Sequence, residues 1–170
     1  TWYKVWELPY EHVPYDLDIS PDGRQLSASM GEVNGDQFLR VWDIGRLLEG
    51  DFKPLSEFHF GQSVPESFVF SPDGRYLYGS SYYTGVSNIF RYAVATGAVE
   101  AVSNAETGLF RPVPLADGRL ETRCYSRALG NLVWTRVAPA EKLEEFHQTE
   151  GSPAASTPAS RNGDEKAASS

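Results

Sequence analysis

Two carboxylates, Asp22 and Asp73, are the first candidates for chemistry, because the same five residues, SPDGR, occur at Ser20–Arg24 and Ser71–Arg75. An acidic side chain at a turn can act as a general acid or bind a metal ion. A calcium loop, however, requires several oxygen ligands at closely spaced positions, and none flank this motif. A catalytic residue is needed once, whereas a hairpin corner is needed in every repeated unit. We therefore predict a structural role for both carboxylates.

No other side chains form a pattern typical of catalysis, cofactor binding or metal binding. A nucleophile elbow reads G-x-S-x-G, which neither GQSVP around Ser63 nor GSSYY around Ser80 matches. The single cysteine, Cys124, has no cysteine or histidine beside it, which favours a passive thiol on a strand. The three histidines are far apart and lack metal-ligand spacing. The sequence thus predicts that the chain is not an enzyme and holds no cofactor and no metal.

Each residue of the SPDG corner has a mechanical role in a tight turn. Proline fixes φ near about −65°, aspartate accepts hydrogen bonds from nearby N–H groups, glycine adopts the left-handed conformation, and serine caps the turn. A weaker copy occurs in PLADGRL, around Asp117. The predicted structural turns comprise Ser20, Pro21, Asp22, Gly23, Ser71, Pro72, Asp73, Gly74, Asp117 and Gly118.

The corners belong to a longer repeat. Aligning Asp22 with Asp73 gives a shift of 51 residues, which places ISPDGRQLSAS on FSPDGRYLYGS. Eighteen residues after each aspartate comes an arginine inside an apolar strand, Arg40 and Arg91. Asp117 follows Asp73 by 44 residues and begins the third copy. A repeat of about 45 to 50 residues is close to the length of a four-stranded propeller blade.

Runs of β-branched and aromatic residues between turn residues predict the strands of each unit. In the second unit these are ESFVFS, RYLYGSS, SNIFRYAVA and AVEAVSN, and in the first unit GRLLEGD predicts a longer loop or one helical turn. We expect an all-β chain of about three β-propeller blades, each of four antiparallel strands, at residues 15–60, 65–105 and 108–137. Outside the blades, we expect the end of a preceding blade at 1–10, a short helix or linker at 138–150, and a disordered Ala/Ser-rich tail at 151–170.

Composition limits the partners that the chain can bind. A formal net charge of −8 and a pI near 4.9 argue against nucleic acid, because binding phosphates requires clustered Lys and Arg. No apolar run approaches the roughly 20 residues that span a bilayer, and no segment resembles a signal peptide, so we expect no membrane insertion. The chain begins directly in a strand-like segment, TWYKVWEL, which predicts a fragment of a longer protein or a truncated one.

The segment Ser71 to Leu120 resembles the blade repeat of TolB-like propeller proteins of the bacterial envelope, and the first unit resembles it more loosely. The resemblance covers about residues 15 to 120, and its motif is specific for this type of blade rather than for one function. It implies a propeller of six or more blades that serves as a protein-docking surface, commonly in the periplasm. Three blades are too few to close a ring, so the missing blades are expected from the rest of a parent chain or from self-association.

Tyr82, Tyr83 and Asn88 lie in SSYYTGVSN, the predicted connection between the second and third strands of the second unit. Loops on a rigid scaffold often carry recognition residues, and tyrosine offers a large contact area with a polar tip. We therefore consider these three residues as partner contacts. The alternative is that the tyrosines pack between neighbouring blades, as we expect of the four tryptophans.

Two functions from different classes remain open at the level of sequence. The first is a non-enzymatic protein-interaction module, part of a TolB-like propeller of the cell envelope, with a protein partner of unknown identity. The second is an accessory propeller that gates a serine peptidase of the prolyl oligopeptidase type, whose catalytic domain would lie outside this chain. A G-x-S-x-G elbow downstream in the parent gene would distinguish the second from the first. A scaffold propeller in the cytoplasm is a third alternative.

Overall fold

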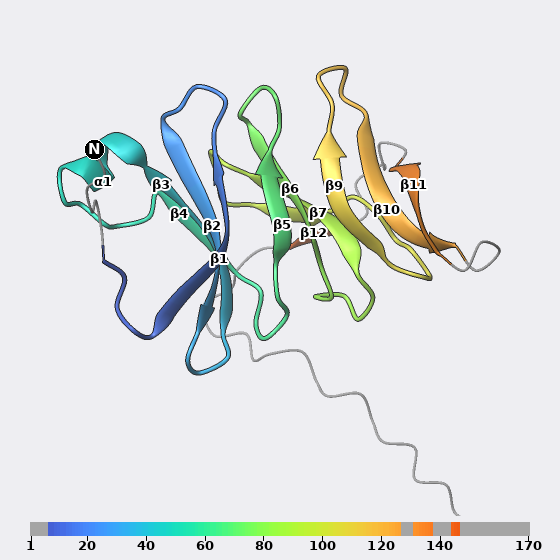
Figure 1. The fold of residues 1–170 in the computed structure, drawn as a ribbon, viewed down its shortest axis with the longest axis horizontal. Helices are drawn as coiled ribbons and strands as arrows, with labels where there is room; N and C mark the ends of the chain where they lie inside the picture. The colour runs from blue at the N-terminus through green and yellow to red at the C-terminus, as the bar shows by residue number, and fades with distance from the viewer. Residues whose placement is uncertain (1–6, 127–130, 138–143, 147–170) are drawn as a thin grey trace, which may run out of the picture.

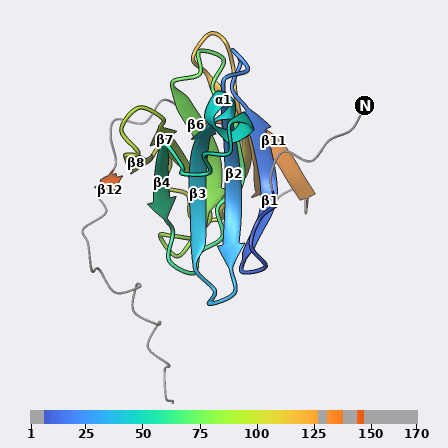
Figure 2. The ribbon, with the colours of Figure 1, turned by 90° about the vertical axis from the view of Figure 1, so that its left-hand side faces the viewer.

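The computed structural model describes residues 7–126, 131–137 and 144–146. These residues form three antiparallel sheets that follow one another along the molecule, with one short helix (Figure 1). Figure 2 looks from the end where the first sheet and the helix lie nearest the viewer. Of the expected end of a preceding blade at residues 1–10, residues 1–6 fall outside the described residues, as does the expected tail at 151–170.

The three sheets correspond to three blades. The first blade has the strand order β1-β2-β3-β4, with β1 (His12–Ile19), β2 (Gln25–Glu32), β3 (Gln37–Asp43) and β4 (Ser56–His59). The second has the order β12-β8-β7-β6-β5, with β5 (Glu66–Phe70), β6 (Tyr76–Ser81), β7 (Asn88–Ala93), β8 (Val99–Ala101) and β12 (Glu144–Phe146). The third has the order β11-β10-β9, with β9 (Leu109–Pro114), β10 (Leu120–Ser126) and β11 (Asn131–Val137). The all-β fold class predicted from the sequence is thereby confirmed.

The longer connection in the first blade contains the single helix of the described residues, α1 (Ile44–Leu48). Asp43 caps it, because its carboxylate accepts a hydrogen bond from the Arg46 N–H at 2.9 Å. Leu47 is buried beside Trp42, and the Trp42 indole N–H donates to the carbonyl of Phe52 at 3.0 Å. The segment GRLLEGD therefore forms one helical turn, one of the two forms expected from its sequence.

Strand β12 differs from the sequence prediction. Its three residues pair antiparallel with β8, from Glu144 opposite Ala101 to Phe146 opposite Val99. We expected a short helix or linker at residues 138–150, and the described part of that segment, residues 144–146, extends the second sheet by a fifth strand. The outer edge of β8 offers unpaired N–H and C=O groups, and pairing with them outweighs the local preference of KLEEF for a helix. The remaining residues of 138–150 lie outside the described residues.

Each SPDG corner turns the chain from the first into the second strand of its blade. In the second blade the Gly74 N–H donates to the Ser71 carbonyl at 2.8 Å, and the Tyr76 N–H donates to the Ser71 hydroxyl at 3.0 Å. That hydroxyl donates to Asp73 at 2.6 Å. The φ of Gly74 is 71°, in the left-handed region that glycine adopts at little cost. The corner at Ser20–Gly23 repeats these bonds.

The main core fills the space between the first and second blades. It is made of Leu39, Val41, Phe58, Phe60, Phe68, Phe70, Leu77, Phe90, Tyr92, Val99 and Ala101. Gly79 lies flat against the Phe68 ring, and a Cβ on Gly79 would lie 2.1 Å from it. A smaller cluster of Ala28, Met30, Trp42 and Leu47 lies on the opposite face of the first blade. The two clusters show that the first blade is apolar on both faces, as expected of a blade with neighbours on both sides.

Candidate binding groove at the blade corners

Two aspartates of β1 tie the first blade to the second. Asp16 accepts a hydrogen bond from the Ser67 N–H at 2.8 Å, and Asp18 accepts one from the Phe70 N–H at 2.8 Å. Strand β5 lies at the edge of its sheet, so no strand pairs with its outer side. The carboxylates satisfy N–H groups that would otherwise be orphaned in a partly buried junction. The sequence did not reveal this role, because YDLDI is an ordinary alternating strand pattern.

The first strand of each blade (β1, β5 or β9) is irregular at the same place in the repeat. Ser67 and Arg111 have positive φ values of 54° and 50°, and each precedes the corner aspartate of its blade, Asp73 or Asp117, by six residues. The strand register shifts at the corresponding point in all three blades. Such a bulge changes the direction of the backbone groups, and here it accompanies the bond from Ser67 to Asp16.

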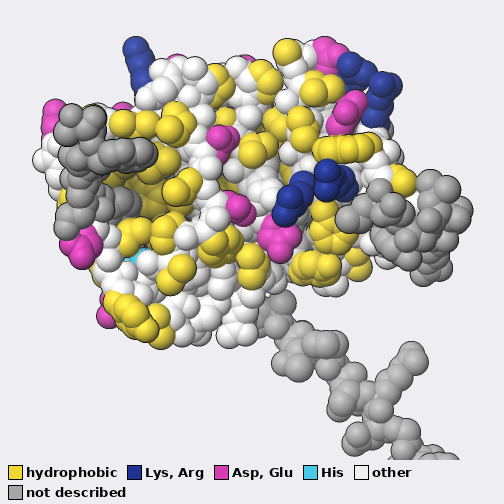
Figure 3. Space-filling model, viewed as in Figure 1, with side chains coloured by type: hydrophobic (Ala, Val, Ile, Leu, Met, Phe, Trp, Pro, Cys, Tyr) yellow, Lys and Arg dark blue, Asp and Glu magenta, His cyan; other side chains and the backbone are white. Residues whose placement is uncertain are grey.

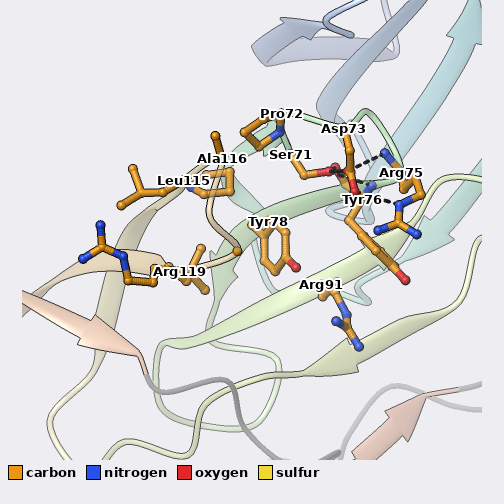
Figure 4. Close-up of a pocket in the computed structure, with 13 residues that line it drawn as sticks. Ser71, Pro72, Asp73, Arg75, Tyr76, Tyr78, Arg91, Leu115, Ala116 and Arg119 are labelled. Carbon is orange, nitrogen blue, oxygen red and sulfur yellow. Dashed lines mark hydrogen bonds and ion pairs between the residues drawn. The ribbon is translucent and has the colours of Figure 1, made fainter.

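A groove of about 310 Å³ lies between the corner of the second blade and that of the third (Figure 4). Tyr76 and Tyr78 of β6 and Arg91 of β7 form one wall. The corner residues 71–75 lie at the rim above them. The opposite wall comes from the third blade and consists of Pro114, Leu115, Ala116, Gly118, Arg119 and Leu120. The groove therefore combines two phenol rings with an aliphatic wall.

The side chains that line the groove include more arginines than carboxylates. Three arginines and one aspartate line it, whereas the whole chain has a formal net charge of −8. The Arg91 guanidinium lies 4.7 Å from the centroid of the Tyr76 ring, and that of Arg75 lies 5.7 Å from it. Both contacts are within the range of a cation–π interaction. Two guanidinium groups therefore lie against one aromatic ring at the rim of the groove.

Each of the three arginines is held by one carboxylate. Arg91 donates from Nε to Glu100 at 2.7 Å, and it lies over the β7–β8 pair. Arg75 and Arg119 donate from Nε to the aspartate two residues earlier in their own corners, both at 2.7 Å. A guanidinium has five N–H donors, so one carboxylate uses only part of that capacity. The three paired arginines therefore still have N–H groups that can donate to a hydrogen-bond acceptor on a partner.

Hydrogen bonds keep the corner carboxylates ionised. The Ser71 hydroxyl, followed by the backbone and side chain of Arg75, lowers the pKa of Asp73 to about 2. Hydrogen bonds within their own corners also lower the pKa values of Asp22 and Asp117. A carboxylate with a depressed pKa is a poor proton donor near neutral pH. This agrees with the structural role predicted for SPDG.

Arg40 and Arg91 occupy the same position in the repeat but point in opposite directions. Each pairs with a glutamate on the fourth strand of its blade, Arg40 with Glu57 at 2.8 Å and Arg91 with Glu100. However, Arg40 is opposite Ala28 in the sheet register, whereas Arg91 is opposite Tyr78, the repeat equivalent of Ser27. A register slip of one residue moves a side chain to the other face of a sheet. Arg91 therefore faces the third blade, and Arg40 faces away from the second.

The three loop residues that we considered as partner contacts have different surroundings. Tyr83 packs edge-on against the rings of Phe58, Phe60 and Phe90, at centroid distances from 5.6 to 6.2 Å. It therefore belongs to the interface between the first and second blades, as the alternative interpretation held. Tyr82 is 54% exposed, and its ring lies 6.3 Å from that of Phe110. Only Tyr82 offers a large side-chain surface to solvent.

Asn88 is buried and satisfied within the chain. Its side-chain oxygen accepts hydrogen bonds from the Ser103 hydroxyl at 3.0 Å and the Ala105 N–H at 2.8 Å. Its amide nitrogen donates to the Thr84 hydroxyl at 3.1 Å. Asn88 thus joins the loop before β7 to the segment after β8, and we withdraw it from the proposed contacts because no surface remains for a partner.

The tryptophans were expected between blades. Trp42 is buried, but it packs against α1 on the outer face of the first blade. Trp134 is 55% exposed on β11, with the Arg123 guanidinium 4.9 Å from its ring centroid. Trp134 therefore does not pack between two of the described blades. Trp2 and Trp6 lie outside the described residues.

Searches of the described side chains give two further results. Among residues 7–126, 131–137 and 144–146, no three His, Cys, Asp or Glu side chains come close enough together to hold a metal ion. In the same part of the chain, no helix has the length and apolarity that crossing a membrane requires. His12 and His59 each lie beside one carboxylate, Glu32 at 3.2 Å and Asp36 at 3.3 Å.

Comparison with known sequences gives no relative. No protein-family model matches the chain, and no curated protein matches it. Solved structures do match. The chain is similar to the putative TolB of Agrobacterium tumefaciens, with a TM-score of 0.57 and 20% identity over 79% of this chain and 50% of that one.

Two further solved structures show the same likeness. TolB of Acinetobacter baumannii gives a TM-score of 0.50 and 17% identity over 72% of this chain and 32% of that one. An acylaminoacyl peptidase in complex with a chloromethyl ketone gives 0.53 and 13% identity over 79% of this chain and 25% of that one. With its three consecutive sheets, the chain is a β-propeller by fold. Its match to the Agrobacterium TolB spans half the length of that protein.

Proposed function

We propose that the chain is part of a protein-docking propeller and that the corner groove between the second and third blades binds an extended segment of the partner. The observation that carries this proposal is the composition of the groove, where Tyr76, Tyr78 and three arginines lie opposite an aliphatic wall. Tyrosine and arginine are enriched where proteins bind one another. The proposed segment carries acidic residues, which match the arginines, and apolar residues, which match Leu115 and Leu120.

The bacterial envelope is the compartment that we propose. The resemblance of the SPDG blades to TolB-like proteins supports it, and the structural likeness to two bacterial TolB proteins is consistent with it. The negative charge of the chain supports a protein partner over nucleic acid, because nucleic-acid binding depends on a net positive surface.

Site-specific photocrosslinking tests the proposed groove. A photoreactive phenylalanine analogue replaces Tyr78 in the full-length gene product, and cells of the source organism are irradiated. The matched control carries the same analogue at Tyr10, which is 89% exposed and does not line the groove. We expect a discrete crosslinked protein from position 78 alone, and we expect Arg119→Glu to reduce its yield at least fivefold. Equal products from both positions, or none at position 78, would contradict the proposal.

A second function is supported by the likeness to the acylaminoacyl peptidase, which is as strong as that to the Acinetobacter TolB. In that case the blades would restrict access to a hydrolase domain elsewhere in the parent protein. The test is a fluorophosphonate probe applied to the full-length gene product. Labelling of a serine would favour the peptidase, whereas an unlabelled product would leave the docking propeller as the proposal.

A further inference from the structure

The outer face of the first blade exposes side chains whose equivalents in the second blade are buried. Leu17 and Ile19 of β1 are 65% and 56% exposed. With the repeat shift of 51 residues, their equivalents in the second blade are Phe68 and Phe70, which are only 3% and 7% exposed. The preceding blade covers those two phenylalanines. The first blade therefore presents a row of side chains of the kind that a preceding blade covers.

The opposite end of the molecule is exposed in a corresponding way. Val113 of β9 is 42% exposed, and Trp134 of β11 is 55% exposed. Glu121 is opposite Val113 in the sheet register, and Arg123 is opposite Trp134, so these side chains share one face. Leu120 precedes Glu121 and therefore points to the opposite face of the strand, where it is buried toward the second blade. The face with Trp134 therefore points away from the rest of the chain.

The two end faces carry opposite charges. On the first blade, Arg40 bonds to two glutamates, Glu32 and Glu57, which gives this cluster one excess negative charge. On the third blade, Arg123 and Arg136 accompany the single Glu121, which gives one excess positive charge. Figure 3 shows hydrophobic side chains gathered at the end formed by β1 and α1, and Lys and Arg side chains beside Asp and Glu at the end formed by β9 and β10.

We infer that the occupant of each end face is a second copy of this chain, joined head to tail. The Leu17 face of one copy packs against the Trp134 face of the other, and the reciprocal contact closes the ring. Such a contact joins different surfaces, and it forms a closed two-fold assembly when the rotation per copy is half a turn. The inference does not depend on the corner groove.

Molar mass in solution tests the inference, with the 170-residue chain studied alone by light scattering after size exclusion at about 50 μM. We expect twice the 18.9 kDa of one chain. Leu17→Arg and Trp134→Glu each place a charge in one end face, and we expect both variants to be monomers with an unchanged circular dichroism spectrum. The control is Val64→Arg, at a position that is 41% exposed in the connection between the first and second blades, and it should stay dimeric.

Mixing the two monomeric variants decides the arrangement. A head-to-tail ring retains one intact contact in the mixture, between the Leu17 face of the Trp134→Glu copy and the Trp134 face of the Leu17→Arg copy. We therefore expect a one-to-one heterodimer, at least tenfold weaker than the original dimer. A monomeric original chain would overturn the inference. So would a dimer that Leu17→Arg disrupts and Trp134→Glu does not, because that result would mean that two Leu17 faces pack together.

Discussion

At the scale of the residue, the repeated SPDG motif works through a few hydrogen bonds. Ser71 closes the corner, Asp73 accepts from both Ser71 and Arg75, and Gly74 supplies the positive φ. The low pKa of the carboxylate reflects its hydrogen bonds within the corner. The residue type that first suggested chemistry is thus used for geometry, in the second blade as in the first.

We expect Asp73→Asn to weaken the fold in a pH-dependent way. The folded state lowers the pKa of Asp73 from 3.8 to about 2, so its stabilisation is complete above about pH 4 and is lost as the pH falls toward 2. At pH 7 the loss should be about 1 kcal/mol, because the side chain is exposed. Urea unfolding at pH 7 and pH 2.5 measures it, with exposed Glu106→Gln as the control. An equal loss at both pH values would contradict this explanation.

Gly79→Ala should be among the most destabilising single methyl additions in the second blade. A Cβ there would lie 2.1 Å from the buried Phe68 ring, which cannot move without disturbing the core. We expect a loss of at least about 2 kcal/mol in the free energy of unfolding. Gly31→Ala is the matched control on β2, because its nearest contact is the flexible side chain of Gln37 at 3.3 Å. Equal effects of the two substitutions would show that the close packing at Gly79 is not decisive.

At the scale of the element, blades are joined by polar as well as apolar contacts. Strand β1 contacts β5 through Asp16 and Asp18. Their carboxylates accept hydrogen bonds from N–H groups on the edge of β5 that no strand covers. This arrangement sets the position of one blade against the next more specifically than apolar packing alone. The junction between the second and third blades lacks an equivalent pair, because Ser67 and Val69 occupy the repeat positions of the two aspartates.

Asp18→Ala should loosen this junction at one identifiable amide. The Phe70 N–H would lose its acceptor while it stays partly buried, which should cost about 1–3 kcal/mol. Amide hydrogen exchange measures the effect, and we expect the protection of Phe70 to fall at least tenfold while that of Leu77, inside the sheet, changes only with global stability. Unchanged exchange at Phe70 would mean that the carboxylate is not its main partner.

The sequence predicted the fold well and the binding site poorly, for a physical reason. Strand existence and corner position follow from local residue types, so the repeat of Asp22 and Asp73 was enough to locate them. The groove depends on which face of β7 carries Arg91 and on how the third blade sits above it, and both depend on register between distant segments. The pairing of β12 was missed for the same reason, because an open sheet edge cannot be recognised from the segment that covers it.

At the scale of the whole molecule, the described chain is a run of blades with two uncovered faces. Repeat proteins gain much of their stability from contacts between neighbouring units, so a run with open ends lacks the contacts of its terminal faces. The exposure of Leu17 at one end and Trp134 at the other is the structural sign of that loss. Their burial by a second copy would recover it.

We therefore expect the melting temperature of the chain to depend on its concentration. Association stabilises the folded state by mass action, so a tenfold increase in concentration should raise Tm by about 2–5 °C. Calorimetry between about 5 and 50 μM measures the shift, and the Leu17→Arg variant, which cannot associate in our inference, should show none. A sharp, reversible transition at one temperature across this range would indicate blades that are stable alone.

The opposite orientation of Arg40 and Arg91 has a consequence for the junctions between such repeats. Both arginines follow their corner aspartates by eighteen residues, so no insertion separates the two units between these points. Ala28 nevertheless pairs with Arg40, whereas Gly79, the repeat equivalent of Ala28, pairs with Phe90. A shift of one residue in the pairing of the hairpin thus exchanges the two sides of a whole strand without any change in length. An alignment of the two units by sequence therefore matches two arginines that lie on opposite faces of their blades. A hairpin that pairs one residue out of step therefore alters the junction with a neighbouring unit more than a point mutation does, because it inverts the charge pattern that this unit must accept.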